Sequence, residues 1–213
     1  MVVSKDAEMV SIDENIDEAV QKAKKLFLEG AVFAYPTDTI YGFGANPFNE
    51  DAVRRIDEIK RRENDKSYIM LIDSIETLRK YIEIKTEKHL DFLFSIWPNP
   101  ISVVLTLNSK TSKILGVETA AFRVPNNRFC LKLTGELKMP LISTSVNRSS
   151  QPPILEASEI YDEFSSEIEA IFFTGKKSFY TASTLIDLSD SVPVLIRSGK
   201  IKFEDLLDKF NKC

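Results

Sequence analysis

Polar side chains that could bind a charged substrate gather at two places, each just after an apolar run. The first is the segment Pro36–Gly44, where two threonines, an aspartate and a tyrosine follow the apolar residues 32–35. Pro36 lacks a backbone donor and closes the expected strand. Gly42 and Gly44 can take positive φ and let another backbone or a ligand come close. Open α/β sheets bind ligands at such strand ends, although an ordinary turn from strand to helix is the alternative interpretation.

The second cluster is the segment from Ser143 to Ser150, which follows another short apolar run. It offers several hydroxyl groups and the amide of Asn147. Serine and asparagine are also common turn residues, so a simple turn is again the alternative. Two loops of this kind in one chain favour a shared binding site.

Three cations could meet an anion. Lys60 and Arg62 lie two residues apart at the end of an expected helix. They either cap that helix by interacting with its dipole or bind phosphate or carboxylate oxygens. Arg123 lies among apolar neighbours in an expected strand. A buried arginine needs an anionic partner, which is either a structural carboxylate or the phosphate of a ligand.

The elements that must position these groups follow from apolar periodicity. Helices are expected at 16–27, 49–60, 74–82, 88–97, 158–164 and 203–210, and strands at 32–35, 67–72, 101–107, 119–124, 170–173, 183–186 and 192–196. Some consecutive strands lack a helix between them, which indicates an α/β fold with a twisted mixed sheet and flanking helices. We expect one domain over residues 1–213. His89 is expected on the surface of its helix rather than in catalysis.

Composition narrows the functional class. The net charge of −4 and the pI near 5.3 argue against a general nucleic-acid-coating protein. Two cysteines and one histidine give neither a disulfide framework nor a histidine metal site. The N-terminus is too polar for a signal peptide, and no apolar run is long enough for a membrane span. A cytoplasmic protein without membrane contact is expected.

Familiar nucleotide and hydrolase motifs do not match. Gly175 lacks the earlier glycine of a phosphate loop, because Ala170 stands at that position. The Gly42-Phe43-Gly44 triplet does not continue into a dinucleotide fingerprint, and no GxSxG elbow occurs. Residue chemistry alone therefore predicts an α/β protein with an anion-binding site.

A resemblance extends this prediction. Seven segments resemble, in order, motifs of the YrdC/YciO-type family of threonylcarbamoyl-AMP synthases. The matching segments are Pro36–Gly44 (PTDTxYGLG), Lys60–Arg62 (KxR), Trp97–Ser102 (WPGPLT), Phe122–Pro125 (RxP), Ser143–Asn147 (STSAN, with its SxN), Ala182–Asp187 (PSTIVD) and Ile196–Gly199 (RxG). The chain departs from the family pattern at Ser67, Asn99, Val146 and Ser150. It resembles the short, single-domain form of the family.

The resemblance implies a YrdC-like twisted open sheet and a nucleotidyltransferase. ATP, L-threonine and bicarbonate would give L-threonylcarbamoyl-AMP and pyrophosphate, with Mg²⁺ accompanying ATP and no protein ligand for it identified. A downstream threonylcarbamoyl transferase complex would use the product to modify adenosine in tRNA. Implied catalytic residues are Lys60, Arg62, Ser145 and Asn147; implied substrate-binding residues are Thr37, Thr39, Tyr41 and Arg123; implied nucleotide-binding residues are Ser143, Ser183 and Arg197.

Two alternatives remain open at this point. One is a module that binds RNA, including double-stranded RNA, because the family has a concave basic face. The other is a paralogue that performs a related carbamoylation, or a YciO-like paralogue that binds RNA or nucleotide without the synthase activity.

Overall fold

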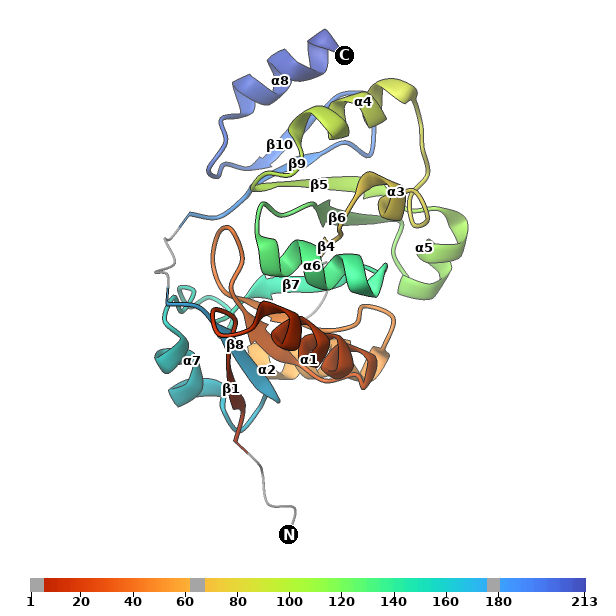
Figure 1. Cartoon of the computed structure of the whole chain (residues 1–213). Coiled ribbons are helices and arrows are strands. Elements are labelled where there is room, and N and C mark those ends of the chain that lie inside the picture. The colour runs from red at the N-terminus through yellow and green to blue at the C-terminus, as the bar shows by residue number, and fades with distance from the viewer. Residues whose placement is uncertain (1–5, 62–67, 176–180) are drawn as a thin grey trace. The chain divides into compact units, whose positions relative to one another are not determined.

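The computed structural model describes residues 6–61, 68–175 and 181–213 (Figure 1). It contains two compact units, each made of two stretches of chain. The first unit comprises Met1–Lys66 and Leu141–Tyr180, and the second comprises Ser67–Pro140 and Thr181–Cys213. Both contain a mixed sheet with flanking helices, so the predicted α/β class is confirmed. The prediction of a single domain stays a prediction.

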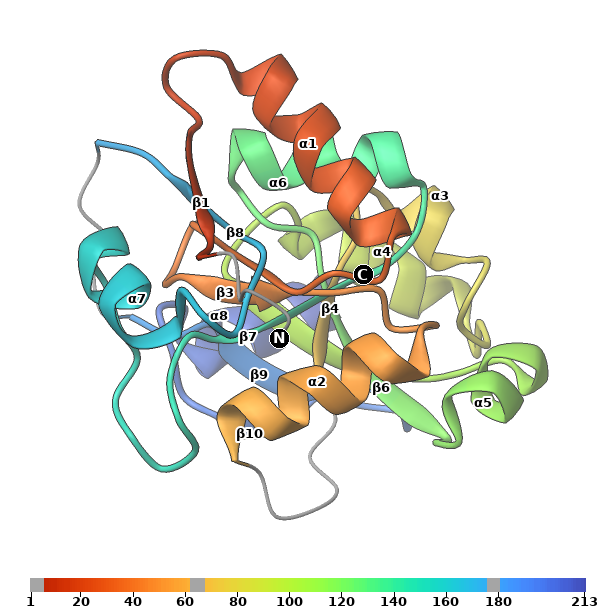
Figure 2. The ribbon, with the colours of Figure 1, turned by 90° about the horizontal axis from the view of Figure 1, so that it is seen from below.

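The first unit carries most of the predicted site residues. Its elements are β1 (Glu8–Ser11), α1 (Ile16–Leu28), β2 (Phe33–Tyr35), β3 (Gly42–Gly44), α2 (Glu50–Lys60), β7 (Leu141–Ser145), α7 (Ala157–Phe164) and β8 (Ala170–Phe173). The strand order is β1-β8-β2-β3-β7, with β3 antiparallel to both neighbours and the other pairs parallel. Figure 2 shows α1 and α2 on opposite faces of these strands. Strands β2, β7 and β8 run in the same direction, so their C-terminal ends lie at the same end of the sheet.

The second unit has the strand order β4-β6-β5-β9-β10. Its elements are β4 (Ile69–Leu71), α3 (Ile75–Leu78), α4 (Glu87–Ile96), β5 (Ile101–Thr106), α5 (Ser109–Leu115), β6 (Thr119–Arg123), α6 (Arg128–Leu137), β9 (Thr184–Asp187), β10 (Val194–Arg197) and α8 (Phe203–Lys212). Strand β5 runs antiparallel to β6 and parallel to β9. Along the described parts of the chain, no helix is long and apolar enough to cross a membrane.

Side-chain caps define where the helices start. Asn15 accepts from two backbone N–H groups of α1, Asn49 from one of α2 and Ser74 from one of α3. The sequence predicted these starts. Asn108 and Asn127 cap α5 and α6 in the same way, but neither helix was predicted.

Gly42 and Gly44 permit the expected close approach but do not use the positive φ that glycine allows. Both lie in strand β3, and the described glycines with positive φ are others, Gly30 and Gly116. A Cβ on Gly44 would lie 2.7 Å from the ring of Phe33 and 2.8 Å from that of Tyr35. Glycine is required here because rings on the neighbouring strand occupy the space above the backbone.

The expected exposure of His89 was wrong. Its residue is only 7% exposed, and its ring centroid lies 6.1 Å from that of Phe210 on α8. Its Nε2 lies 3.3 Å from the carbonyl oxygen of Ser191. The partners are more than a hundred residues away in sequence, so helical periodicity alone could not reveal this burial.

Candidate active site

The end of α2 and the end of β7 meet through Lys60. The residue is 3% exposed, and its Nζ donates to the carbonyl oxygens of Ser145 at 2.6 Å and Asn147 at 3.1 Å. It also donates to Oδ1 of Asn147 at 2.7 Å. An ammonium group has three donors, so this loop can engage all of them. The structure thus brings together three of the four predicted catalytic residues.

Asn147 is held on both sides of its amide. Its Oδ1 accepts from the hydroxyl of Ser145 at 2.7 Å as well as from Lys60, and its Nδ2 donates to the carbonyl of Gln151 at 2.5 Å. These contacts fix which end of the amide faces the lysine. The result is a small charge-assisted network whose geometry is set before any substrate arrives.

The fourth predicted catalytic residue, Arg62, lies outside the described residues, as does the departure at Ser67. Between Lys60 and Arg62, the exposed Arg61 ends α2 with a left-handed backbone, φ 50°. Its N–H satisfies carbonyls of the last helical turn. Lys60 does not simply cap the helix, because its side chain reaches the β7 loop instead.

The threonine-rich loop after β2 folds around the hydroxyl of Thr37. This oxygen donates to the carbonyl of Ile40 at 2.7 Å and accepts from the backbone N–H of Thr39 at 3.0 Å. The two threonine hydroxyls lie 2.9 Å apart. Thr39 is buried. The loop therefore forms a turn around the Thr37 hydroxyl and holds two adjacent hydroxyls in one arrangement.

Tyr41 joins this loop to the loop after β7. Its carbonyl accepts from the backbone N–H of Val146 at 3.2 Å, and its side chain is buried. Burial raises the pKa of Tyr41 to about 12; a hydrogen bond with the Thr174 backbone opposes the shift, and the nearby carboxylates of Glu156 and Asp13 add to it. The phenol is therefore protonated at neutral pH and able to donate.

Ser143 lies on β7 beside β3. A Cβ on Gly42 would approach its Oγ to 2.8 Å, so the glycine makes room for this hydroxyl. The two predicted loops are thus neighbours, and they hold Thr37, Thr39, Tyr41, Ser143, Ser145 and Asn147 within one unit.

A second group of predicted residues lies in the other unit. Arg197 Nη2 donates to the carbonyl oxygen of Ser183 at 3.0 Å and contacts its hydroxyl at 3.1 Å. The hydroxyl of Ser102 is 2.9 Å from that of Ser183. Gly199 lies directly over this segment, since a Cβ there would be 2.3 Å from the carbonyl carbon of Ser183. The structure therefore joins Ser183 with Arg197 through the RxG segment.

Arg123 is 4% exposed at the end of β6. The register pairs Val103 with Phe122 in antiparallel strands, so Arg123 is one residue beyond that pair, as Ser102 is on β5. This places the arginine at the end of the sheet where Ser183 immediately precedes β9. Its burial agrees with the sequence prediction, and both anionic partners considered above stay open.

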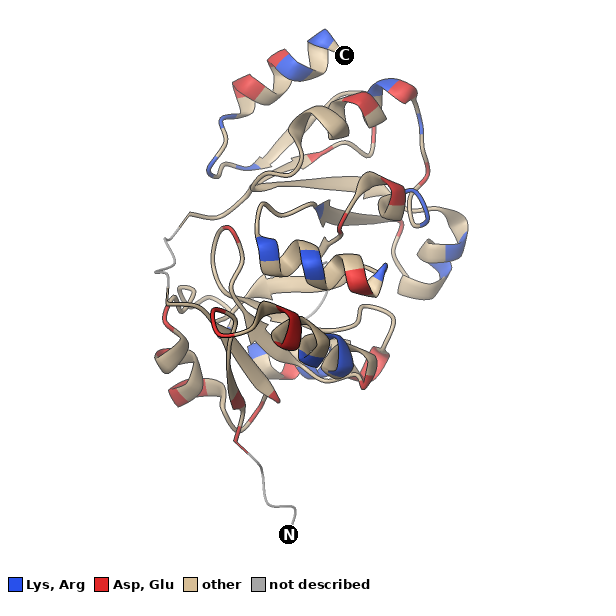
Figure 3. Ribbon diagram, in the orientation of Figure 1, with Lys and Arg blue, Asp and Glu red and all other residues tan. Residues whose placement is uncertain are grey.

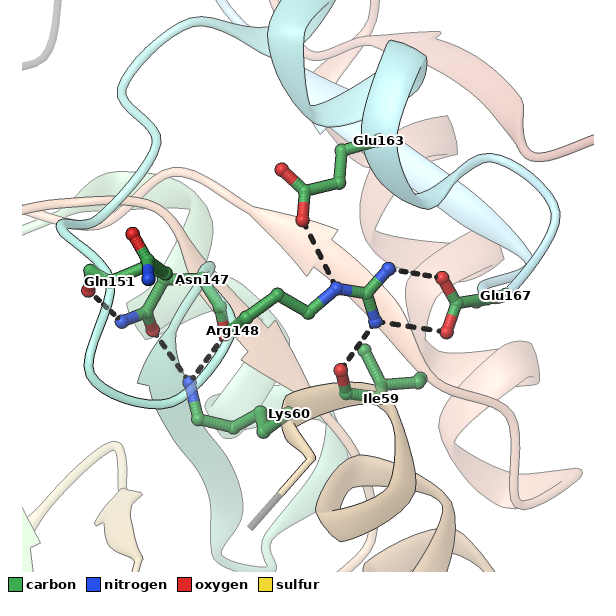
Figure 4. Close-up of polar contacts among 7 residues, drawn as sticks. All are labelled: Ile59, Lys60, Asn147, Arg148, Gln151, Glu163 and Glu167. Atoms are coloured by element: carbon green, nitrogen blue, oxygen red, sulfur yellow. Dashed lines mark hydrogen bonds and ion pairs between the residues drawn. The ribbon is translucent and has the colours of Figure 1, made fainter.

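Sequence reasoning missed Arg148. Its guanidinium donates to Glu163, to both carboxylate oxygens of Glu167 and to the carbonyl of Ile59 in the last turn of α2 (Figure 4). The clue was its position directly after Asn147. Its partners lie on α7, just after α7 and at the end of α2, so no pattern in the sequence around Arg148 identifies them.

Two of the departures from the family pattern have visible local effects. Ser150 adopts a positive φ of 67°, a conformation that glycine takes without cost and serine does not. Asn99 donates from Nδ2 to the carbonyl of Ile96 at 2.8 Å, so it ties its turn to the end of α4. Val146 is fully buried.

Metal binding by the protein itself finds no support in the described parts of the chain, where no three His, Cys, Asp or Glu side chains gather as possible ligands. The residues near Lys60 offer hydroxyls, an amide and a cation instead. Such a set suits an anion rather than a bare divalent ion.

Comparisons with known proteins agree with the motif pattern. Residues 25–199 match the Sua5/YciO/YrdC family, which carries the description "Telomere recombination". A Pyrococcus abyssi protein named threonylcarbamoyl-AMP synthase is 32% identical over 93% of this chain and 59% of its own length. A Bacillus subtilis protein of the same name is 31% identical over 89% of this chain and 56% of its own length. The chain thus spans somewhat more than half of these curated relatives.

Solved structures show the same relationship. The crystal structure of Pyrococcus abyssi Sua5 complexed with L-threonine has a TM-score of 0.85 and 31% identity, covering 95% of this chain and 60% of that one. E. coli YciO, at 22% identity, has a TM-score of 0.83 over 94% of this chain and 98% of its own, which shows the shared fold. The family match extends over both compact units. The chain belongs to the Sua5/YciO/YrdC family.

Proposed function

We propose that this protein is an L-threonylcarbamoyladenylate synthase, a nucleotidyltransferase that supplies tRNA modification. Relatives with that name match most of the chain, and a similar solved structure contains L-threonine. The observation that carries the proposal is the Lys60–Ser145–Asn147 network beside the loop containing Thr37, where a fixed cation and fixed hydroxyls adjoin.

In the proposed reaction, the amino group of threonine combines with carbon dioxide from bicarbonate to form a carbamate. A carbamate oxygen attacks the α-phosphorus of ATP, the bond to the β-phosphate breaks, and pyrophosphate leaves. This displacement needs positioning and charge neutralisation rather than a protein nucleophile. That requirement suits the positive charge of Lys60 and the polar groups of Ser145 and Asn147 around it, together with Arg62.

The remaining roles belong to the same proposal. Thr37, Thr39 and the protonated Tyr41 shape the threonine pocket. In addition, we assign Ser143, Ser183, Arg197 and Arg123 to the nucleotide or to substrate oxygens. Mg²⁺ enters with the phosphates of ATP, and no protein ligand set is assigned to it. A threonylcarbamoyl transferase complex and tRNA follow as the users of the product.

The test measures pyrophosphate released from ATP by the purified chain with Mg²⁺, bicarbonate and threonine. Release should require both threonine and bicarbonate. Undiminished release without threonine would show that the acceptor is wrongly assigned. Absence of release under every condition, together with measurable nucleotide or RNA binding, would favour the YciO-like alternative.

Threonine selectivity gives a second measurement. A pocket that hydrogen-bonds the β-hydroxyl should reject valine, because a buried polar group would lose its partner. Serine should bind more weakly by about 1 kcal/mol for lack of the methyl group. Equal calorimetric affinities for threonine, serine and valine would contradict the proposed pocket.

A further inference from the structure

Arg148 occupies a cage made by α2, α7 and the turn after α7. Its Nε donates to Glu163 at 3.0 Å, and its two terminal nitrogens contact the carboxylate of Glu167 at 3.0 and 2.5 Å. Only 15% of its side chain is exposed. The guanidinium carbon also lies 4.3 Å from the ring centre of Phe164. A planar guanidinium suits such a site, where a fork of donors and a stacking face are both used.

The same guanidinium holds the last turn of α2. Nη1 donates to the carbonyl of Ile59, one of the helix-end carbonyls that have no intrahelical donor. The next carbonyl, that of Lys60, accepts from the backbone N–H of Ser149 at 2.8 Å. Lys60 Nζ also donates to Asn147 (Figure 4). Residues 59–60 are therefore bonded to residues 147–149 through the carbonyls of Ile59 and Lys60 and through the side chain of Lys60.

Aromatic contacts connect the two cations a second time. The ring of Phe164 meets that of Phe43 edge to face, with centroids 5.1 Å apart. The ammonium of Lys60 lies 5.8 Å from the centre of the Phe43 ring. Arg148 and Lys60 thus flank a pair of buried rings that pack against each other.

Charge decides what kind of role Arg148 has. Segment Ala157–Phe164 carries Glu159, Asp162 and Glu163 and no Lys or Arg, and Figure 3 shows acidic residues on this helix. The hydrogen bond with Glu167 raises the pKa of Arg148, against an opposing effect of burial. Two carboxylates around one guanidinium leave it little attraction for a phosphate. The chemistry favours a structural support over a substrate ligand.

We propose that Arg148 is a positioning residue that fixes Lys60 and Asn147 in the geometry needed for attack on the α-phosphorus. This inference rests on the proposed function and deepens it. Misplacing a reacting group by about 1 Å can cost on the order of a hundredfold in rate, so loss of this support should slow catalysis even in a folded protein.

The experiment compares Arg148→Met with Arg55→Met. Arg55 is the matched control, because it also joins α2 to residues after α7 through Glu169 and the carbonyl of Glu167. Among the described residues, Arg55 forms no hydrogen bond or ion pair with residues 147–149. Arg148→Met loses the ion pairs with Glu163 and Glu167, and Arg55→Met loses the pair with Glu169. Only Arg148→Met also loses the bond to Ile59.

Two readouts are measured well below the melting temperature of each variant. The first is kcat and KM for pyrophosphate release. The second is hydrogen exchange of the Ser149 amide, which needs no activity. Arg148→Met should lower kcat at least tenfold, change KM for ATP less than threefold and raise Ser149 exchange at least tenfold. Arg55→Met should leave both readouts near the wild-type values.

Arg148→Lys and Glu167→Gln are milder substitutions that test the same contacts if Arg148→Met does not fold. Lysine keeps the charge but cannot make the forked contact, so its kcat should lie between those of the wild type and Arg148→Met. Glu167→Gln keeps the donor to Ile59 and should be slowed less than Arg148→Met. Unchanged kcat and Ser149 exchange in folded Arg148 variants, or equal losses in Arg55→Met, would overturn the inference.

Failure of the proposed function can be told apart from failure of this inference. A wild-type chain that releases no pyrophosphate refutes the function. Exchange at Ser149 then decides the positioning role by itself: lost protection in Arg148→Met supports it, and unchanged protection overturns it.

Discussion

Replacing Lys60 by methionine tests the cation at the centre of the site. Methionine keeps an unbranched apolar stem against Phe43 but removes the donors that reach Ser145 and Asn147 at 2.6, 3.1 and 2.7 Å. Hydrogen bonds to a charged group are worth about 1.5–3 kcal/mol each. A large part of that gain is offset by the cost of taking an ammonium that is 3% exposed out of water.

We therefore expect Lys60→Met to lower the free energy of unfolding by roughly 2 kcal/mol, far less than the sum of three bonds. For a chain of this size, that corresponds to about 4–8 °C in Tm. The effect on rate should be larger. Loss of a preorganised positive charge beside the charge that develops on the phosphate costs about 3 kcal/mol of barrier, or about a hundredfold in kcat.

The assay is pyrophosphate release at 20–25 °C with thermal melts of each variant. Arg61→Gln is the control, because Arg61 is exposed and contributes its backbone to the helix end; its rate should be nearly unchanged. A folded Lys60→Met variant with the wild-type rate would refute a catalytic role for Lys60. An Arg61→Gln variant as slow as Lys60→Met would show that the motif is misplaced.

Three further predictions concern the supporting structure. Ser150→Gly should raise stability by roughly 0.5 kcal/mol, because serine at φ 67° is strained; a lower Tm would contradict this. Gly199→Ala should lower the free energy of unfolding by about 3 kcal/mol or more, since its Cβ would lie 2.3 Å from backbone atoms of Ser183. Its control, Gly135→Ala, has open space around the new Cβ in α6 and should stabilise the protein. Equal changes in Tm for the two variants would refute the packing argument. The hydrogen bond from Arg148 lowers the pKa of Glu167 below its usual 4.5; the charge of Arg148 adds to this shift and burial opposes it. The contribution of the ionised Glu167 to folding stability is therefore complete above pH 4.5 and is lost as the pH falls through the lowered pKa. Urea melts between pH 6 and 3 should therefore show a smaller loss of stability in Arg148→Met than in the wild type.

Local chemistry predicted much of this fold. The helix starts at Asn15, Asn49 and Ser74 could be predicted, because each capping side chain and the backbone N–H groups that donate to it are neighbours in sequence. The apolar run before Pro36 was likewise correctly identified as a strand. The motif order also identified the family, although the roles of individual site residues stay predictions.

Features that depend on partners far away in the sequence could not be predicted from it. Gly42 and Gly44 looked like loop residues, since the rings that require them in a strand become neighbours only through sheet pairing. His89 looked exposed for the same reason. Arg148 gave no signal, because Glu163 and Glu167 become its partners only once α7 has packed.

The path of the chain through the two units affects how the site is made during synthesis. Lys60 is separated by 85 residues from Ser145 and by 87 from Asn147, and residues Ser67–Pro140 of the second unit are translated in between. At about 5–20 residues per second, the lysine waits several seconds on the ribosome before its partners emerge. Contacts of such high sequence separation also slow folding in general. The end of α2, where Ile59 and Lys60 are buried in the folded protein, is therefore without its β7 partner during this interval. A nascent chain stalled before residue 141 is the species in which a chaperone would find it exposed.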